Sequence, residues 1–338
     1  MAAAASPSPW TIETRTVVLL TVIISVMLTA FAWPAVRSST HDVPIAVAGP
    51  AAAAGRVSAA LEQRLPNGFE ITRVDTPAAA EQLIRDREVY GAIDVSAGTP
   101  QVLTASAGSA SIAQTLQGVA GALGPAQAAV AVHDVVALPA DDPRGAGLTA
   151  AAFPLVLGGM LAAVLLTNLV RGRVRRIAGA LAFAVTGGLA MAAILQFWLG
   201  SLDGAYLANS GAIALTVAAT SMTILGLESL LGYAGFGIGA AIMMLLGNPL
   251  SGISTAPETL PGWSGTLGQL LPPGAGGHLL RSTAYFGGHG EAQPIIVLVA
   301  WLALGAVLGL LGHHRSRRAA AATTAGETTA QPAPYATV

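Results

Sequence analysis

Residues 16–36 read TVVLLTVIISVMLTAFAWPAV, an apolar run without a charged side chain. A hydrocarbon core about 30 Å thick needs about 20 helical residues at about 1.5 Å of rise per residue, so this run is long enough to cross a membrane. A stretch of ordinary polarity, 37–148, follows it, and nearly all of 149–312 is apolar again. This order predicts a polytopic α-helical membrane protein with one large domain outside the bilayer.

The overall composition agrees with this prediction. Hydrophobic residues make up 53% of the chain and charged residues only 10%, against about 25% charged in average soluble domains. The formal net charge of −1 gives no reason to expect a nucleic-acid partner. Because the sequence contains no cysteine, disulfides, thiolate metal sites and cysteine nucleophiles are excluded.

The first apolar run is either a retained span or a cleaved signal peptide. Ala30, Phe31 and Ala32 resemble a small-x-small cleavage site. The run nevertheless continues to Val36, which is longer than the usual apolar region of 7–15 residues in a signal peptide. Trp33 would suit the outer membrane interface as an aromatic anchor. We favour a retained span and keep cleavage as the alternative.

Four arginines between two long apolar runs predict the orientation of the chain. Short cytoplasmic loops carry an excess of arginine, so the loop with Arg171, Arg173, Arg175 and Arg176 is expected inside. A second basic group, 313–318, follows the last apolar run and is also expected inside. We therefore predict six transmembrane helices in a bacterial plasma membrane, at 16–36, 149–170, 177–199, 211–231, 235–250 and 294–312.

With six spans, both termini are cytoplasmic, namely 1–15 and a tail of 313–338 that is expected to be disordered. The domain 37–148 is then outside, and its seven arginines against eleven acidic residues give it a charge of −4. The arginine loop has three possible roles: a topology anchor, a contact to lipid headgroups, or a docking site for a partner.

The outer domain shows the pattern of a small α/β unit. Strands and helices alternate in it, which favours a mixed layer structure over a sandwich. The expected strands are 44–48, 69–74, 90–95 and 101–104, and the expected helices are 51–65, 76–87 and 109–123. The alanine-rich segment 110–131 could pack on this domain or reach back to the membrane.

Catalytic motifs are missing from the sequence. No nucleotide-binding loop follows Gly49, and neither a metalloprotease nor a serine-hydrolase motif occurs. We therefore expect no enzyme activity, no cofactor and no metal, so that any ATP hydrolysis would come from a partner.

Glu228 is the one acidic residue well inside an apolar stretch. Carboxylates within a membrane are costly and often serve transport. By the predicted topology, Glu228 lies one turn from the cytoplasmic end of its span, where it could reach water or Arg176. Both an interfacial role and a transport role remain open.

The segment 246–288 has the densest pattern of glycine and proline in the chain. Asn248 and Pro249 cannot continue a regular helix, so the fifth span should end early. Two short apolar helices separated by prolines follow. Irregular backbone at membrane depth persists only when it packs on protein or faces water, so we expect a re-entrant outer segment at 251–290.

Several short motifs of this segment occur together, namely Ser251-Gly252, Pro257-Glu258, Leu260-Pro261, Leu270 to Pro272, Leu280-Arg281 and Gly287-Gly288. These residues resemble the last extracellular segment of type-2 ABC-exporter permeases, in the branch that includes phage-infection-protein-like membrane proteins. That branch also has a large domain between its first two spans, and residues 80–93 resemble its helix–strand unit.

The resemblance implies a permease-like homodimer that moves a hydrophobic or lipidic molecule outward with an ATP-binding subunit supplied in trans. It also implies that Pro257, Glu258, Pro261, Pro272 and Arg281 shape the outer re-entrant helices near the exit. For the prolines we favour the simpler roles in turns and helix capping. Glu258 and Arg281 are the better candidates, because both carry charge beside apolar helices, and they could form an ion pair.

Two features depart from the family. Family members dock their ATPase through an amphipathic N-terminal helix and a loop between spans two and three. Here the segment 1–15 is short and contains Pro7 and Pro9, and the loop 171–176 is small. The alternative function is therefore a non-transporting envelope protein whose outer domain binds or scaffolds partners.

Overall fold

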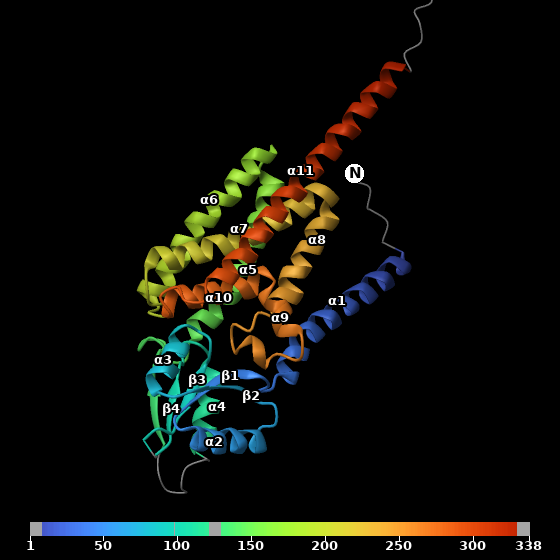
Figure 1. Cartoon of the computed structure of the whole chain (residues 1–338). Helices are drawn as coiled ribbons and strands as arrows, with labels where there is room; N and C mark the ends of the chain where they lie inside the picture. The colour runs from blue at the N-terminus through green and yellow to red at the C-terminus, as the bar shows by residue number, and fades with distance from the viewer. Residues whose placement is uncertain (1–8, 98, 122–129, 330–338) are drawn as a thin grey trace, which may run out of the picture.

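A computed structural model of the chain describes residues 9–97, 99–121 and 130–329. It consists of a bundle of long helices with a small α/β domain at one end (Figure 1). We call the end of the bundle next to this domain the sheet end, and the opposite end, where Arg171 to Arg176 lie, the arginine end.

Five helical segments of the described chain are long and apolar enough to cross a membrane. They contain helix α1 (Trp10–Arg37), α5 (Ala146–Leu169), α6 (Arg173–Ala193) with a π-helical turn to Trp198, α7 (Tyr206–Leu231) and the first part of α11 (Ala292–Thr329). This length and composition support a membrane-embedded helical protein.

The segment predicted as the fifth span is shorter than the others. Helix α8 (Tyr233–Ala241) continues as a π-helical turn, Ile242–Gly247, and the helix ends there because Asn248 and Pro249 follow. At about 1.5 Å per residue this segment is about 22 Å long, which is less than a hydrocarbon core of about 30 Å. Six spans are therefore not confirmed.

The α/β domain contains a five-stranded sheet in the order β2-β1-β3-β4-β5. Strand β1 is parallel to β2 and β3, β3 and β4 are antiparallel, and β4 is parallel to β5. The strands are β1 (Val43–Ala48), β2 (Phe69–Val74), β3 (Gly91–Asp94), β4 (Gln101–Thr104) and β5 (Ala131–Asp134). The first four match the predicted strands closely, and β5 was missed.

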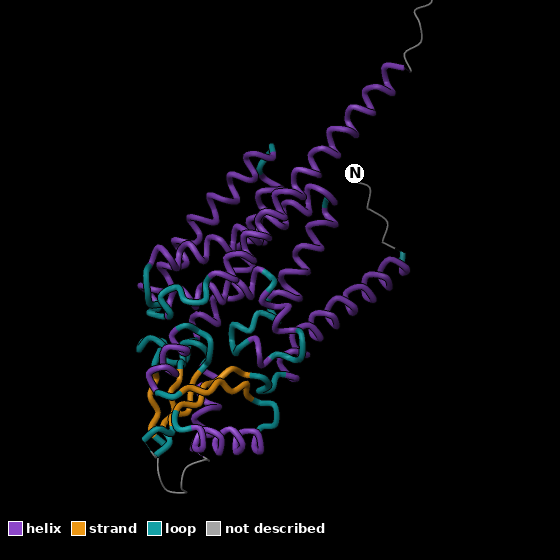
Figure 2. The backbone as a smooth tube through the Cα atoms, in the orientation of Figure 1, coloured by secondary structure: helices purple, strands orange, loops and turns teal. Residues whose placement is uncertain are grey.

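Helices cover both faces of this sheet (Figures 1 and 2). Side chains alternate along β1, so Ile45 packs in the core beneath α2 (Ala51–Arg64) and α4 (Ala110–Gly121), whereas Ala46 packs in the core beneath α3 (Pro77–Arg85). Helix α4 buries Ile112 and Leu116 against the sheet. The alanine-rich segment therefore packs on the α/β domain up to Gly121, and 122–129 lies outside the described residues.

Helix α7 forms the centre of the bundle, where small residues let helices approach closely. A Cβ added to Gly226 would lie 2.3 Å from the carbonyl oxygen of Gly305 on α11, so the two backbones touch. Gly235 and Gly239 on α8 likewise face α7, which places this pair of glycines in packing within the subunit. The Thr223 hydroxyl donates to the carbonyl of Trp301 at 3.1 Å and joins α7 to α11.

Helix α1 stands apart from the other long helices (Figure 1). Its apolar side chains are largely exposed, with Leu28 69% and Val36 79% accessible. Its C-terminal end is attached to the rest of the fold, where the Ser39 amide donates to the carbonyl of Thr259 at 3.0 Å. A helix this apolar and this exposed requires lipid or a protein partner around it.

Helix α11 continues well beyond the predicted span, to Thr329. The segment 313–329 was expected to be disordered, whereas the backbone there is helical. Alanine has the highest helix propensity, so an alanine-rich continuation of an existing helix needs no new nucleus. The remainder of the predicted disordered tail, 330–338, lies outside the described residues.

Candidate functional site

A groove opens between α1, α5 and the chain that follows α8. Its volume is about 400 Å³. Its walls are apolar or carry hydroxyl groups, which suits a partly apolar ligand. The lining residues are Phe31, Pro34 and Ala35 on α1 with Ser38 just after it, Thr149, Ala152 and Phe153 on α5, and Asn248, Pro249, residues 251–255 and Leu260.

The third wall of the groove is irregular backbone that is held in place locally. The Ser251 hydroxyl donates to the carbonyl of Asn248 at 2.7 Å. Gly252 has a φ of +64°, and a Cβ at this position would lie 2.8 Å from the nitrogen of Pro257. Glycine therefore permits the tight approach that closes this wall.

The predicted re-entrant segment contains two short helices, α9 (Ser264–Gln269) and α10 (Pro272–Tyr285). Pro272 occupies the first turn of α10, where its missing N–H costs nothing. Pro257 begins a single 3₁₀ turn, and the Pro261 carbonyl accepts from the Ser264 amide and hydroxyl. These positions agree with roles of the prolines in helix starts and turns.

Helix α10 is almost completely buried and is joined to α7 by a polar network. The Thr283 hydroxyl donates to the Asn209 side-chain oxygen at 2.8 Å. The Asn209 amide in turn donates to the carbonyl of Asp203 at 2.7 Å. Gly276 faces Thr216 on α7, with 2.3 Å between a would-be Cβ and the nearest threonine carbon. Helix α10, which is shorter than a membrane span, is thus packed against protein, as irregular segments near a bilayer must be.

Charged residues gather where α10 meets the α/β domain. The Tyr90 hydroxyl donates to the Glu258 carboxylate at 2.7 Å. The Arg281 guanidinium donates to the carbonyl of Ile253 at 2.7 Å, and its Nε atom is buried without a hydrogen-bond partner among the described residues. The structure therefore brings Glu258 and Arg281 into one cluster, but no ion pair joins them directly in the part of the chain described. The Glu258 carboxylate instead accepts a hydrogen bond from Tyr90.

Arg87 joins the two parts of the molecule. Its guanidinium donates to the carbonyl of His278 at 3.1 Å and to the hydroxyl of Ser282, both on α10. It also lies over the ring of Phe286, 5.0 Å from the centroid. The backbone φ of Arg87 is +63°, a strained conformation for a residue with a side chain. The turn between α3 and β3 is thus held by its contacts to α10.

Burial alters the acid–base chemistry of this cluster. Burial, together with the nearby positive charge of Arg281, lowers the pKa of Arg87 to about 10. Burial and the two arginines lower the pKa of His278 to about 3, so this histidine is neutral at pH 7. Burial and the Glu258 carboxylate raise the pKa of Tyr90. The carboxylate of Glu258 lies close enough to both Arg87 and Arg281 to interact with them electrostatically.

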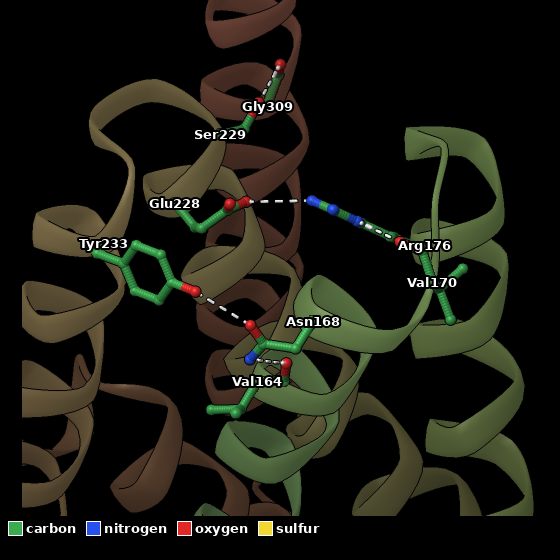
Figure 3. Close-up of polar contacts among 8 residues, drawn as sticks. All are labelled: Val164, Asn168, Val170, Arg176, Glu228, Ser229, Tyr233 and Gly309. Atoms are coloured by element: carbon green, nitrogen blue, oxygen red, sulfur yellow. Dashed lines mark hydrogen bonds and ion pairs between the residues drawn. The ribbon is translucent and has the colours of Figure 1, made fainter. Parts of the chain in front are cut away.

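At the arginine end, Glu228 and Arg176 meet as expected (Figure 3). The carboxylate lies 3.7 Å from the guanidinium. The Arg176 Nε also donates to the carbonyl of Val170 at 2.8 Å, which fixes the side chain against the end of α5. Arg173 lies nearby and is partly buried, whereas Arg171 and Arg175 are exposed. Glu228 is thus paired with Arg176, and both an interfacial role and a transport role for it stay predictions.

The candidate residues thus form two separate groups, one at each end of the bundle. Sequence reasoning missed Arg87, Tyr90 and His278 at the sheet end. Arg87 and Tyr90 lie in a soluble-looking helix–strand unit, where a charged or aromatic residue gives no signal of a contact with a segment nearly 200 positions away. Comparisons of the chain with protein-family models, with curated proteins and with solved structures found no match.

Proposed function

We propose that the chain is a permease-like subunit of an ABC-type exporter that moves a hydrophobic or lipidic molecule outward. The observation that carries the proposal is the groove between α1 and α5. A lipid could enter it sideways, since α1 is separated from the other long helices and presents apolar side chains on all sides. The hydroxyl groups of Ser38 and Thr149 supply polar contacts at its rim.

The proposal includes six membrane crossings, with the α/β domain outside. Helix α8 starts at the arginine end and its π-helical continuation ends near the sheet end (Figure 1), which supports a sixth crossing. A short apolar segment can be accommodated by local thinning of the bilayer. The arginine end then faces the cytoplasm, in agreement with the distribution of arginine.

ATP hydrolysis would be supplied by a partner at the arginine end. Arg171 and Arg175 are exposed there and are free to contact a docking subunit. A second copy of the chain could cover the exposed α1. A second candidate function is a non-transporting scaffold, which is favoured by the fixed attachment of the α/β domain through Arg87.

Filling the groove tests the proposal. In a purified complex of the full chain with its ATP-binding subunit, Ala35→Trp should reduce ATP turnover in phosphatidylethanolamine–phosphatidylglycerol liposomes about tenfold, or ~1.4 kcal/mol. The bulky ring would occupy the space that the transported molecule needs. The control Val36→Trp lies next to it on the exposed surface of α1, outside the groove lining, and should leave turnover nearly unchanged.

Two results would contradict the permease proposal. One is an intact, folded chain that recovers no ATP-binding subunit, which would favour the scaffold. The other is an equal effect of both tryptophans on ATP turnover, which would remove the groove from the transport path.

A further inference from the structure

A second cavity lies at the arginine end, between the start of α6, the end of α7 and the middle of α11. Its volume is about 350 Å³. Four glycines line it, so backbone forms part of its wall. The glycines are Gly172, Gly226, Gly305 and Gly309, and the polar lining residues are Arg173, Arg176, Glu228, Ser229 and His313.

Two of the four arginines at this end line the cavity and the other two do not. Arg173 and Arg176 line it and are partly buried, whereas Arg171 and Arg175 are exposed and do not line it. Arg176 is paired with Glu228 at 3.7 Å. Arg173 has no ion pair with any carboxylate in the described part of the chain, so the cavity carries an uncompensated positive charge.

The side chain of Arg173 extends toward the opposite wall of the cavity, which α11 forms. Its Nη2 atom would lie 2.6 Å from a Cβ added to Gly309, so the guanidinium reaches across to α11 where glycine leaves room. A guanidinium at this position presents donors that match a phosphate group, and such charge-assisted hydrogen bonds are strong.

We propose that this cavity binds the phosphate of an acidic phospholipid headgroup. The cavity lies at the ends of helices of membrane-crossing length, which is the level at which headgroups lie. Basic pockets between transmembrane helices on the cytoplasmic side are suited to anionic lipids. The site is distinct from the groove at the sheet end. The inference rests on the orientation proposed above but requires no transport function.

Counting retained lipids tests this assignment. The full chain, purified in detergent, is mixed with phosphatidylglycerol or phosphatidylcholine and examined by native mass spectrometry. We expect phosphatidylglycerol to be retained preferentially, and Arg173→Gln to lower its retention about tenfold, as loss of a charge-assisted contact would. Arg175→Gln removes the same charge from the exposed surface and should change retention less than about twofold.

A second variant keeps the charge of Arg173 but changes the position of its guanidinium. Gly309→Ala keeps Arg173 but places a methyl group 2.6 Å from its Nη2 atom, so the guanidinium must move and retention of phosphatidylglycerol should also fall. Equal losses in Arg173→Gln and Arg175→Gln would overturn the site in favour of diffuse attraction. Displacement of the lipid by millimolar inorganic phosphate would overturn the assignment to a lipid and indicate a site for soluble phosphate. Thermal unfolding of each variant establishes that the chain remains folded.

Discussion

Gly268→Ala is expected to destabilise the folded chain by about 3 kcal/mol, because overpacking a closed contact typically costs 1–3 kcal/mol and more when backbone must move. A Cβ at Gly268 would lie 1.6 Å from the carbonyl oxygen of Leu250 and 2.5 Å from its carbonyl carbon. Neither is the end of a flexible side chain. Helix α9 would therefore have to move away from the turn that follows α8.

Thermal unfolding in detergent, followed by tryptophan fluorescence, measures this effect. The matched control is Gly237→Ala, because a Cβ at Gly237 meets nothing within 4 Å and the position is exposed on α8. This control should be neutral or stabilising by up to about 1 kcal/mol, since alanine favours a helix. Equal unfolding temperatures of the two variants would show that α9 does not pack on Leu250.

Glu258→Gln is expected to destabilise the contact between α10 and the α/β domain by about 2–3 kcal/mol, the range for hydrogen bonds that involve a charged group. The glutamine retains an acceptor for Tyr90 but removes the negative charge of Glu258 that offsets Arg87 and Arg281. An unbalanced buried charge is costly, and glutamine has nearly the same shape as glutamate, so the loss of charge accounts for the expected effect.

The effect of Glu258→Gln should appear as faster hydrogen exchange of β3 as well as a lower unfolding temperature. Tyr90→Phe removes only the hydrogen bond and should cost less, about 1–2 kcal/mol. Glu70→Gln on the exposed side of β2 is the matched control and should have little effect. If Glu258→Gln behaved like Glu70→Gln, Glu258 would not be the charge that holds the two parts together.

The sequence predicted the elements whose patterns are local. Apolar runs predicted the long helices, and alternation predicted β1 to β4 to within a residue or two. Strand β5 was missed because its four residues are largely exposed and carry no apolar alternation. The helical continuation of α11 was missed because Ala-, Thr- and Pro-rich composition at a terminus indicates disorder, although alanine alone favours a helix.

At the sheet end, the sequence predicted some of the candidate site residues but not the residues that contact them. Glu258, Arg281 and the prolines of the 246–288 segment are conspicuous charges and breaks in an apolar stretch, so sequence alone identifies them. Their partners are not conspicuous. Tyr90 instead of Arg281 binds Glu258, and Arg87 reaches α10 from a strained turn. Such contacts depend on tertiary packing between distant segments and have no periodicity that a sequence could reveal.

The same interface suggests how the α/β domain relates to the membrane part. Phe286, which follows α10, packs into the core beneath α3 together with Ile84. The guanidinium of Arg87 lies over the ring of Phe286 and donates a hydrogen bond to the carbonyl of His278 on α10. Helix α10 is in turn bonded to α7 through Asn209 and Thr283. A continuous set of contacts therefore joins the sheet to the central helix of the bundle, so movement of either part would be transmitted to the other.

The central claim, six crossings with the α/β domain outside, is tested most directly by cysteine labelling in intact cells. The chain contains no cysteine, so single replacements have no background. With a membrane-impermeant maleimide, we expect Ala59→Cys in the α/β domain and Trp263→Cys before α9 to be labelled, and both positions are exposed. Val174→Cys and Ala234→Cys, also exposed, should be labelled only after the membrane is permeabilised. Labelling of Trp263→Cys and Ala234→Cys from the same side would show that Tyr233–Gly247 does not cross the membrane and would contradict the account.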